Sequence, residues 1–319
     1  MKKEDIMKAL TPIKEQIDPT TAEDTEQHHG LDTGYKVLDS QMGGLESGVT
    51  VVGASSGTGK TAFCLGIAAH AASHGKKVLY FSLEMTQKQI INYRLIPLFS
   101  GVSASKFRAR NPLDMTETAA VIDAKQALQK LEIIIVDSVS KFSDIKDITI
   151  AAKEQGLADL VVIDHIGLVA GFKGSAYESA TRTIDAIADL ARTVDLPLIA
   201  VSQLSRGVSF ENRQPRLHDL RDSGMVEADA TAVLLLHKPQ SPGTYDYTPD
   251  GRLIGSVTIA KNRYGVSDYA IPMVWDEDSV SWQEQRLFDK NYSQTLKDAV
   301  SIYCKQTPEN LADEDLPFD

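Results

Sequence analysis

Residues 49–61 read VTVVGASSGTGKT, an apolar run that leads into a glycine-rich loop ending in lysine and threonine. A stretch of helical pattern, residues 62–73, follows at once. A strand, a glycine-rich loop and a helix in this order form a phosphate-binding loop, whose backbone N–H groups surround the phosphates. A plain connecting turn would need neither the lysine nor the threonine. We therefore expect the nucleotide to be bound by Ser55, Ser56, Gly57, Thr58, Gly59, Lys60, Thr61 and Ala62.

The end of this loop carries its chemistry. We expect Lys60 to place its ammonium on the β- and γ-phosphates of ATP, and Thr61 to ligate Mg²⁺. Ala54 stands where the usual pattern has its first glycine. The motif remains strong, because the strand, the lysine and the threonine occur together.

Short apolar runs alternate with helical patterns along the rest of the chain. Continuous apolar strands separated by helices indicate a parallel sheet covered on both faces, which is a doubly wound α/β core. After Asp250, two longer runs flank a turn near Tyr264 and Gly265, which predicts an antiparallel hairpin appended to the sheet. The expected strands are Val49 to Val52, Val78 to Ser82, Ile133 to Val136, Leu160 to Ile163, Leu198 to Ser202, Val233 to Leu236, Leu253 to Lys261 and Tyr269 to Trp275.

Two of the expected strands end in an aspartate. Asp164 ends the run 160–163 and Asp137 ends the run before it. A nucleotide site places its magnesium-organising carboxylate at such a strand end. We prefer Asp164 for this role, because the next strand ends in a polar residue, Gln203, and we interpret Asp137 as an ordinary strand-end residue.

Glu84 follows the strand that ends at Ser82, at the edge where ligands bind in open α/β folds. It is therefore a candidate general base for the water that attacks the γ-phosphate. A carboxylate at this place also suits the N-terminus of a helix, and spacing alone leaves that alternative open.

Composition excludes several classes of protein. The chain has 319 residues, 42% of them hydrophobic and 24% charged, which is typical of a folded protein of one large or two small domains. Its net charge of −11 argues against a protein that coats nucleic acid through overall electrostatic attraction to the phosphates. We expect a cytoplasmic protein without membrane contact, because no apolar run suits a signal or a membrane span. Cys64 and Cys304 are expected to be free thiols.

The two ends of the chain differ from the core. Apolar residues recur at helical spacing from Ile6 to Ile17, which predicts an amphipathic helix that Pro12 ends or kinks; a frayed terminus remains the alternative. We predict three parts: an N-terminal helix and linker over 1–30, a motor domain over 31–285, and a C-terminal helix with an acidic, disordered tail over 286–319.

The ordered set of motifs resembles the C-terminal, RecA-like motor domain of the DnaB-type replicative helicases. The resemblance covers about Leu31 to Glu284 and is far more specific than a phosphate loop alone. Because the stretch before Leu31 is too short for the helical N-terminal domain of that family, we expect a short form of the kind that a phage or mobile element encodes. The matching stretches are 34–39 (GYKVLD), 43–45 (GGL), the phosphate loop, 82–85 (SLEM), 162–164 (VID), 202–206 (SQLSR), 219–224 (DLRDSG) and 261–263 (KNR).

The resemblance implies a role for each matching residue. Glu84 polarises the hydrolytic water, Gln203 senses the γ-phosphate, and Arg263, accompanied by Lys261, reaches the nucleotide of a neighbouring subunit. It also implies a homo-oligomeric ring, expected to be a hexamer, that unwinds DNA with ATP and Mg²⁺. The expected partners are single-stranded DNA and a helicase loader, primase or other replication protein.

Single-stranded DNA is expected on the segment between Ser205 and Gly224. In the family, the loop that matches this segment holds DNA phosphates inside the ring, and a few contacts per subunit suffice in an acidic protein. Without the resemblance, a solvated surface loop would be the better interpretation. The expected DNA-binding residues are Arg206, Arg221, Asp222 and Gly224.

Two other functions stay open at this point. The stretch 261–265 also resembles the RadA recombination helicases, although their cysteine-rich zinc module is missing. A truncated mimic that joins and regulates a host helicase ring is the non-enzyme alternative. The acidic tail, residues 313–319, resembles the tip of bacterial single-stranded-DNA-binding proteins, but an additional aspartate follows the phenylalanine, which puts such docking in doubt.

Overall fold

The computed structural model describes residues 30–173, 176–204, 213–220, 226, 228–239, 247–248 and 251–284. The predicted N-terminal helix, the acidic tail and the DNA-binding candidates Arg206, Arg221, Asp222 and Gly224 lie outside these residues. None of the helices in the described ranges has the length and apolar character needed to span a bilayer.

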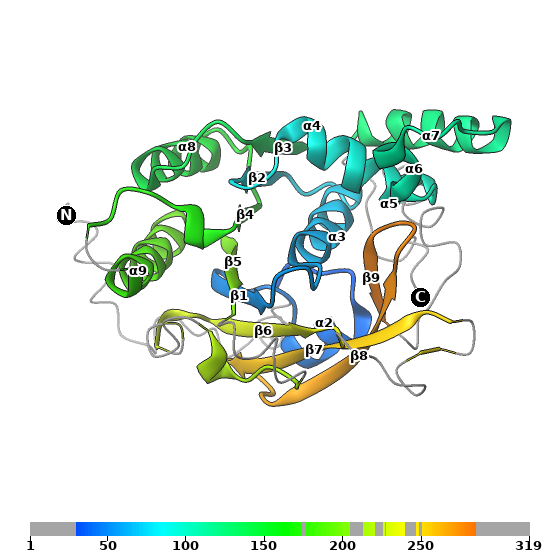
Figure 1. Cartoon of the computed structure of the whole chain (residues 1–319). Helices are drawn as coiled ribbons and strands as arrows, with labels where there is room; N and C mark the ends of the chain where they lie inside the picture. The colour runs from blue at the N-terminus through cyan, green and yellow to red at the C-terminus, as the bar shows by residue number, and fades with distance from the viewer. Residues whose placement is uncertain are drawn as a thin grey trace, which may run out of the picture.

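A nine-stranded sheet in the order β3-β2-β4-β5-β1-β6-β7-β8-β9 forms the centre of the fold (Figure 1). From β3 to β6 all neighbouring strands are parallel. Apolar side chains on both faces of β2, β4, β5, β1 and β6 are buried, which explains the continuous apolar runs there, whereas β3 at the edge of the sheet is partly exposed. The prediction of a parallel α/β core is confirmed. The parallel strands are β1 (Gly48–Ala54), β2 (Val78–Ser82), β3 (Ile133–Val136), β4 (Leu160–Asp164), β5 (Pro197–Gln203) and β6 (Ala232–His237).

Three antiparallel strands extend the sheet beyond β6. These are β7 (Leu253–Asn262), β8 (Tyr269–Asp276) and β9 (Ser281–Glu284), and each pairs antiparallel with the strand before it in the sheet. The predicted hairpin is confirmed, and β9 continues it by one further strand.

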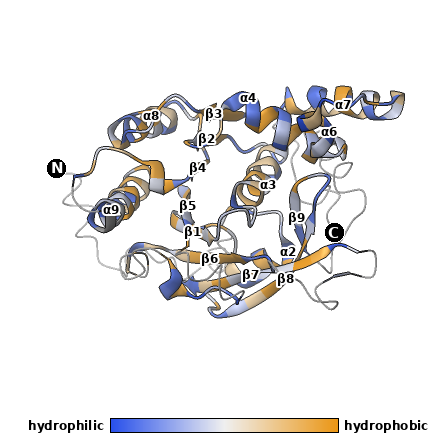
Figure 2. Cartoon of the chain, viewed as in Figure 1, coloured by the Kyte–Doolittle hydropathy of each residue, from blue (hydrophilic) through white to orange (hydrophobic). Residues whose placement is uncertain are grey.

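Helices cover the two faces of the sheet. In Figure 1, α3 (Lys60–Ser73) lies on one face, and α8 (Phe142–Glu154) and α9 (Ala176–Val194) lie on the other. Almost every residue of α3 is buried, as expected of a helix that is apolar on all sides, whereas α8 and α9 mix hydrophilic and hydrophobic residues (Figure 2). Two hydrophobic cores result, one on each face.

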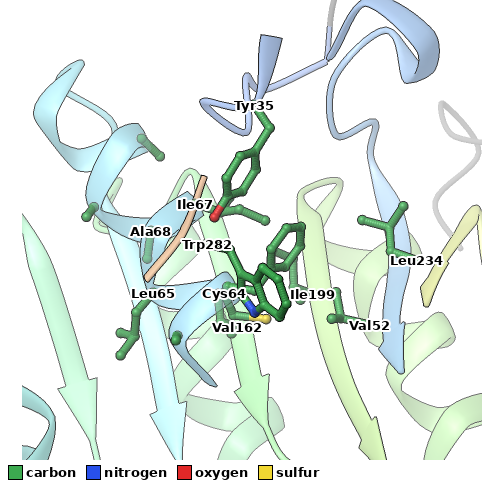
Figure 3. Packing of buried hydrophobic residues seen from close by; sticks show 14 of the residues in the cluster. Tyr35, Val52, Cys64, Leu65, Ile67, Ala68, Val162, Ile199, Leu234 and Trp282 are labelled. Atoms are coloured by element: carbon green, nitrogen blue, oxygen red, sulfur yellow. The ribbon is translucent and has the colours of Figure 1, made fainter. Parts of the chain in front are cut away.

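The core on the α3 side packs aromatic rings against small residues. Tyr35 stacks on Phe63 of α3 with 4.8 Å between ring centroids, and Trp282 of β9 reaches the same cluster beside Cys64 (Figure 3). The alanine residues and the glycine of α3 let the helix approach the sheet closely. The helix that follows the phosphate loop is therefore held firmly by the fold.

A short helix, α2 (Lys36–Met42), connects the beginning of the described chain to its end. The carboxylate of Glu284 on β9 accepts hydrogen bonds from the backbone N–H groups of Val37 at 2.9 Å and Leu38 at 3.1 Å. These are N–H groups of the first helical turn, which have no partner within the helix. Residues 36–42 and β9 are thus joined although they are distant in sequence.

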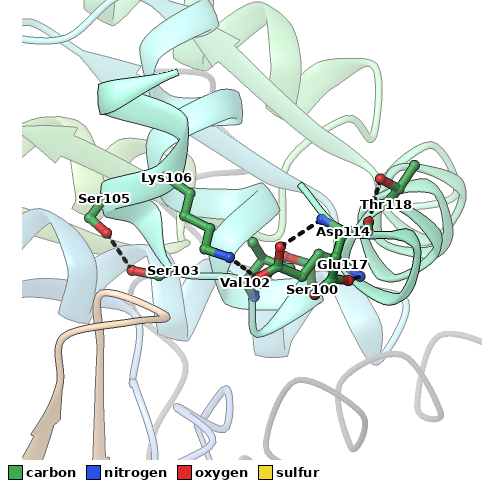
Figure 4. Close-up of polar contacts among 8 residues, drawn as sticks. All are labelled: Ser100, Val102, Ser103, Ser105, Lys106, Asp114, Glu117 and Thr118. Atoms are coloured by element: carbon green, nitrogen blue, oxygen red, sulfur yellow. Dashed lines mark hydrogen bonds and ion pairs between the residues drawn. The ribbon is translucent and has the colours of Figure 1, made fainter. Parts of the chain in front are cut away.

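A helical projection follows β2 and extends away from the sheet (Figure 1). Its own small core contains Ile96, Val102 and Val121. At its outer helix, Asp114 and Glu117 form a reciprocal cap, and Lys106 pairs with Glu117 (Figure 4). The remaining elements are α4 (Gln87–Ile90), the π-helical turn η3 (Ile91–Leu95), α5 (Ile96–Ser100), α6 (Ala104–Ala109), α7 (Met115–Leu128) and the 3-10 turns η4 (Ile166–Leu168) and η5 (Leu217–Asp219).

Candidate nucleotide site

The carboxyl ends of four neighbouring strands, β2, β4, β5 and β1, meet at one edge of the sheet. In the register, Ala54 on β1 lies opposite Gln203 on β5, and Asp164 on β4 lies opposite Ser82 on β2. Because β5 separates β4 from β1, Gln203 stands between the phosphate loop and Asp164. The predicted site residues Gln203 and Asp164 therefore share this edge with the phosphate loop, and Glu84 follows β2 at the same edge.

The phosphate loop rests against two tryptophans. Gly57 and Gly59 have φ angles of +76° and +102°, a region that side-chain-bearing residues rarely adopt. A Cβ added to Gly59 would lie 2.7 Å from the Trp275 ring and 2.9 Å from Nε1 of Trp282. Glycine is required at residue 59 by both backbone and space, and α3 begins directly after it.

Lys60 is held at the phosphate loop by the loop itself. Its Nζ donates hydrogen bonds to the carbonyl oxygens of Ala54 at 3.1 Å and Ser55 at 3.0 Å. Burial lowers the pKa of the Lys60 ammonium, while the carboxylates of Asp164 and Glu84 act in the opposite direction. The ammonium therefore lies within the field of both carboxylates, beside the amides that would receive phosphate.

Asp164 is 4% exposed and is held by two hydroxyl groups. Tyr80 on β2 donates a hydrogen bond to its Oδ2 at 2.9 Å, and Thr61 at the start of α3 donates another. Burial raises the pKa of the Asp164 carboxyl, and these two hydrogen bonds lower it. A hydroxyl and a carboxylate in contact are oxygen ligands of the kind that Mg²⁺ prefers, so this pair fits the metal of a nucleotide site.

Glu84 lies in the turn between β2 and α4, and its side chain is 66% exposed. Its Oε2 lies 4.0 Å from Nε2 of His165, the residue after Asp164. The helix-cap alternative for Glu84 is wrong, because Thr86 caps α4 in a reciprocal arrangement with Gln89. Glu84 is thus an exposed carboxylate at the edge where the phosphates would lie, as a general base requires.

Asp137 has a structural role instead. Its Oδ2 accepts a hydrogen bond from the backbone N–H of Gln87, the first residue of α4, at 2.7 Å. A carboxylate at the first turn of a helix satisfies one of the N–H groups that lack an intrahelical partner. This agrees with its interpretation as a strand-end residue outside the metal site.

Three residues near this edge were missed by sequence reasoning. Tyr80 lies inside an apolar strand, and its hydroxyl was the one signal that it contacts a polar group. Trp275 and Trp282 lie on β8 and β9, and their ring centroids are 5.2 Å apart behind the phosphate loop. Their place could not be inferred without the order of the strands.

Lys261 and Arg263 lie at the opposite edge of the sheet from the phosphate loop, where the parallel strands β1 and β6 begin. Asn262, between them, pairs with Ala232 at the start of β6, which in turn pairs with Thr50 near the start of β1. Lys261 Nζ donates to the carbonyl oxygen of Ala230 at 2.7 Å, and Arg263 donates to that of Ala228. These two residues are therefore not brought to the phosphate loop of their own chain.

The described part of the expected DNA-binding segment contains one strong ion pair. Arg213 donates two hydrogen bonds of 2.7 Å to the carboxylate of Asp219, which also accepts from the backbone N–H of Arg216 at 2.7 Å. The Arg213 hydrogen bonds lower the pKa of the Asp219 carboxyl. Asp219 thus offsets the positive charge of Arg213, so this pair adds no net positive charge to the surface.

The insertion of β5 between the phosphate-loop strand and the aspartate strand, with antiparallel strands beyond β6, defines a RecA-like P-loop nucleotide-hydrolase fold. A family profile described as "DnaB-like helicase C terminal domain" matches residues 30–284. The chain belongs to this family.

Known relatives agree with this assignment. The replicative DNA helicase DnaB of Geobacillus stearothermophilus is 31% identical over 244 residues, which are 74% of this chain and 52% of that protein. A probable plasmid replicative DNA helicase of Chlamydia muridarum is 29% identical over 261 residues, 80% of this chain and 55% of that protein. The chain thus spans about half the length of the curated relatives it matches.

Solved structures show the same fold. A DnaB-like replicative helicase, studied with its primase interactions, superposes with a TM-score of 0.74 at 27% identity, and the match covers 86% of this chain and 66% of that one. A separately solved ATPase domain also gives 0.74, at 26% identity, over 88% of this chain and 98% of its own.

Proposed function

We propose that this chain is the motor domain of a ring-forming, replicative-type DNA helicase that couples ATP hydrolysis to movement along single-stranded DNA. Family membership supports the class of activity. The observation that carries the proposal is the separation of Lys60 from Arg263. Within one chain, the phosphate loop and the expected arginine finger lie at opposite edges of the sheet, so a complete site needs a second copy.

The residues at the nucleotide edge divide the work of hydrolysis. Amides of the phosphate loop and the Lys60 ammonium bind and orient the triphosphate, and Thr61 with Asp164 would hold Mg²⁺. When bound, the metal neutralises negative charge on the phosphates. Glu84 accepts a proton from the attacking water, and Gln203 is placed to detect whether a γ-phosphate is present.

A ring follows from the placement of the phosphate loop and Arg263 at opposite edges of the sheet. If Lys261 and Arg263 of one subunit approach the phosphate loop of the next, the contact is head-to-tail, and repeated head-to-tail contacts close into a ring. An arginine delivered across that interface stabilises charge on the transferring phosphoryl group after assembly. We propose a homo-oligomer, a hexamer by analogy with the family.

The path from the nucleotide to DNA begins at β5. Leu204, directly after Gln203, donates its backbone N–H to the carbonyl oxygen of Ala54 at 3.1 Å and forms a bridge with Leu220. Leu204, just before the segment proposed to bind DNA, and Leu220, within it, are therefore joined beside the phosphate-loop strand. The candidates Arg206 and Arg221, with Asp222 and Gly224, follow these two residues closely in sequence. A change at Gln203 has a short covalent route to that segment.

Replication proteins are the proposed partners. One structural relative is described by its interactions with primase, and primase or a helicase loader is the corresponding proposal for this chain, which would act in the cytoplasm.

The test combines three measurements on the purified chain. We expect ATPase activity that single-stranded DNA stimulates, unwinding of a forked duplex, and an oligomer in native mass spectrometry with an ATP analogue and DNA. The Lys60→Ala variant serves as control and should lose the first two. Strand pairing without unwinding would favour a recombination ATPase, and assembly without hydrolysis would favour a regulatory mimic.

A further inference from the structure

A β-bulge interrupts β7 close to its C-terminal end. Leu234 of β6 pairs with Ile259. The residue before it, Val233, pairs with Lys261, which leaves Ala260 as an additional residue in β7. A bulge of this kind bends the strand and reverses the faces of the residues beyond it, relative to an uninterrupted strand. The last residues of β7 therefore point in a new direction.

The bulge directs the basic residues and the asparagine between them to opposite faces of the sheet. Val233, which lies opposite Lys261, belongs to the core on the α9 side. Ala232, which lies opposite Asn262, belongs to the core on the α3 side. Lys261 and Arg263 are two residues apart and share the α9 face, and their hydrogen bonds to the carbonyl oxygens that precede β6 agree with this.

Asn262 fixes the turn that carries Arg263. Its Oδ1 accepts a hydrogen bond from the backbone N–H of Tyr264 at 3.1 Å. An asparagine that bonds the N–H two residues further along defines a local turn. Arg263 is the residue between the two bonded groups, and its own N–H donates to the carbonyl oxygen of Thr231 at 3.0 Å. The backbone from which the proposed finger extends is thus held on both sides.

The turn packs against α2 near the end of that helix. A Cβ added to Gly265 would lie 2.7 Å from Nδ2 of Asn262 and 3.1 Å from the carbonyl oxygen of Gln41 in α2. Nδ2 of Asn262 is buried and has no hydrogen-bond partner in the part of the chain that the structure describes. A buried donor without a partner is unfavourable, so packing alone would favour an apolar side chain here. The acceptor Oδ1 therefore explains the asparagine.

We propose that Asn262 is a positioning residue for Arg263, whose direction toward a neighbouring subunit it fixes through the hydrogen bond from Tyr264. This inference rests on the proposed function, in which Arg263 acts on the nucleotide of the next subunit. Such a finger needs an exact direction, since a displacement of about 1 Å can lower a rate on the order of 100-fold. Because Asn262 faces α2, it acts through Arg263 and not on the nucleotide.

The experiment compares three substitutions of Asn262 with a matched control, Ser267→Ala, which alters an exposed side chain of the same turn. For Asn262→Ala we expect the kcat of ATP hydrolysis to fall by at least about tenfold. KM and the affinity for a fluorescent non-hydrolysable ATP analogue should stay within about twofold, because the loss concerns the transition state. Asn262→Asp keeps the acceptor and should retain most of kcat. Asn262→Ser should be intermediate, since a hydroxyl forms such turns more weakly, and Ser267→Ala should match the wild type.

Mixed oligomers show whether Asn262 acts through the finger. An Asn262→Ala subunit keeps Lys60, and a Lys60→Ala subunit supplies a correctly held Arg263, so an equal mixture should recover roughly a quarter of the wild-type ATPase. A mixture of Asn262→Ala with Arg263→Ala should show no such recovery, because neither subunit holds a finger in place. Mixed rings confirmed by mass, without recovery in the first mixture, would place the damage in the subunit's own nucleotide site and overturn the proposal.

A double variant provides a second test of the same connection. In an Arg263→Ala background, Asn262→Ala should reduce the residual rate by less than about threefold, because the group that it positions is already gone. An undiminished loss of about tenfold in that background would overturn the proposal.

Stability and the wild-type chain separate the remaining outcomes. Unchanged kcat in Asn262→Ala would overturn the proposal, as would equal loss of kcat in all three Asn262 variants together with a lowered Tm. If Asn262→Ala does not fold, Asn262→Ser decides, since full kcat with the weaker acceptor would contradict positioning. Normal kcat in Arg263→Ala would overturn both the finger and its positioning. Absence of any turnover in the wild-type chain would instead overturn the proposed function itself.

Discussion

Lys60 and Arg263 lie at opposite edges of one sheet. The register links Asn262 through Ala232 to Thr50 of β1. About 13 Å of strand separates Thr50 from Ala54, the last residue of β1. The phosphate loop extends still further beyond that residue. Arg263 therefore cannot reach the phosphate loop of its own chain unless β7 separates from β6.

Mixing two inactive variants tests whether the site is shared. An Arg263→Ala subunit keeps Lys60, and a Lys60→Ala subunit keeps Arg263, so an interface with these partners in the right order is complete. In an equal mixture about a quarter of head-to-tail interfaces are intact, and ATPase should recover to roughly that fraction. Each variant alone should be inactive. Confirmed mixed rings without recovery would argue against a finger acting in trans.

Substitution of Glu84 by glutamine should separate binding from chemistry. The side chain is exposed and caps no helix, so Glu84→Gln should leave the fold and ATP binding intact. Loss of the general base should reduce kcat by about 100-fold or more. Analogue binding and single-turnover hydrolysis measure the two steps separately, and wild-type turnover would remove the catalytic role.

Gly59 should be more sensitive to alanine than Gly57. Both have positive φ angles, so either substitution strains the backbone by about 1–2 kcal/mol. A Cβ on Gly57 meets nothing within 4 Å, whereas one on Gly59 meets the Trp275 ring at 2.7 Å. Urea unfolding without nucleotide should therefore give a lower midpoint for Gly59→Ala than for Gly57→Ala. Equal midpoints would mean that the Trp275 and Trp282 side chains move to accommodate the added methyl group without loss of stability.

The ion pair of Asp219 predicts a stability difference that depends on pH. Arg213 lowers the pKa of the Asp219 carboxyl, so the pair stabilises the fold above the ordinary pKa of about 3.9 and stops doing so as pH falls through the lowered value. At about pH 7, Asp219→Asn should reduce the free energy of unfolding by about 1–3 kcal/mol. The difference from wild type should shrink below about pH 4.

A matched control for that measurement is Asp189→Asn. Asp189 also pairs with an arginine, Arg192, but its side chain is 73% exposed. Exposed ion pairs contribute about 0–1 kcal/mol, so this variant should remain close to wild type at every pH. A similar loss in both variants would show that burial of Asp219 is unimportant.

Much of the fold could be predicted because buried parallel strands are apolar throughout. Residues 160–163 and 198–202 are continuous apolar or small runs, and each forms its strand as expected. The order of strands could not be predicted, because an apolar run does not specify its neighbour. Gln203 was therefore recognised as a polar strand end, but not as the residue between the phosphate loop and Asp164.

Residues that support the site were harder to find. Tyr80 reads as one more apolar strand residue until β2 and β4 are placed side by side, which brings its hydroxyl to Asp164. Such residues act across elements, and local patterns carry little information about them.

Arg221 provides the test of DNA binding. If the segment between Leu204 and Leu220, with the residues that follow it, holds DNA phosphates, Arg221→Ala should weaken binding equally for unrelated single strands, because phosphate contacts carry no base information. The salt dependence of binding should fall by about one contact. Fluorescence anisotropy over a salt series measures both effects. Arg192→Ala, which removes an exposed arginine of α9, should change neither.

The same Arg221 variant also tests coupling to the motor. Basal ATPase should survive, since no described group of the nucleotide site is altered, whereas stimulation by DNA should fall. The reason is geometric, because Leu204 is hydrogen-bonded to Ala54 of the phosphate-loop strand and forms a bridge with Leu220. A change in the bound nucleotide can therefore be transmitted through Leu204 to the segment that binds DNA. Normal DNA binding with collapsed basal hydrolysis would place Arg221 in the nucleotide site or the fold and would contradict this coupling.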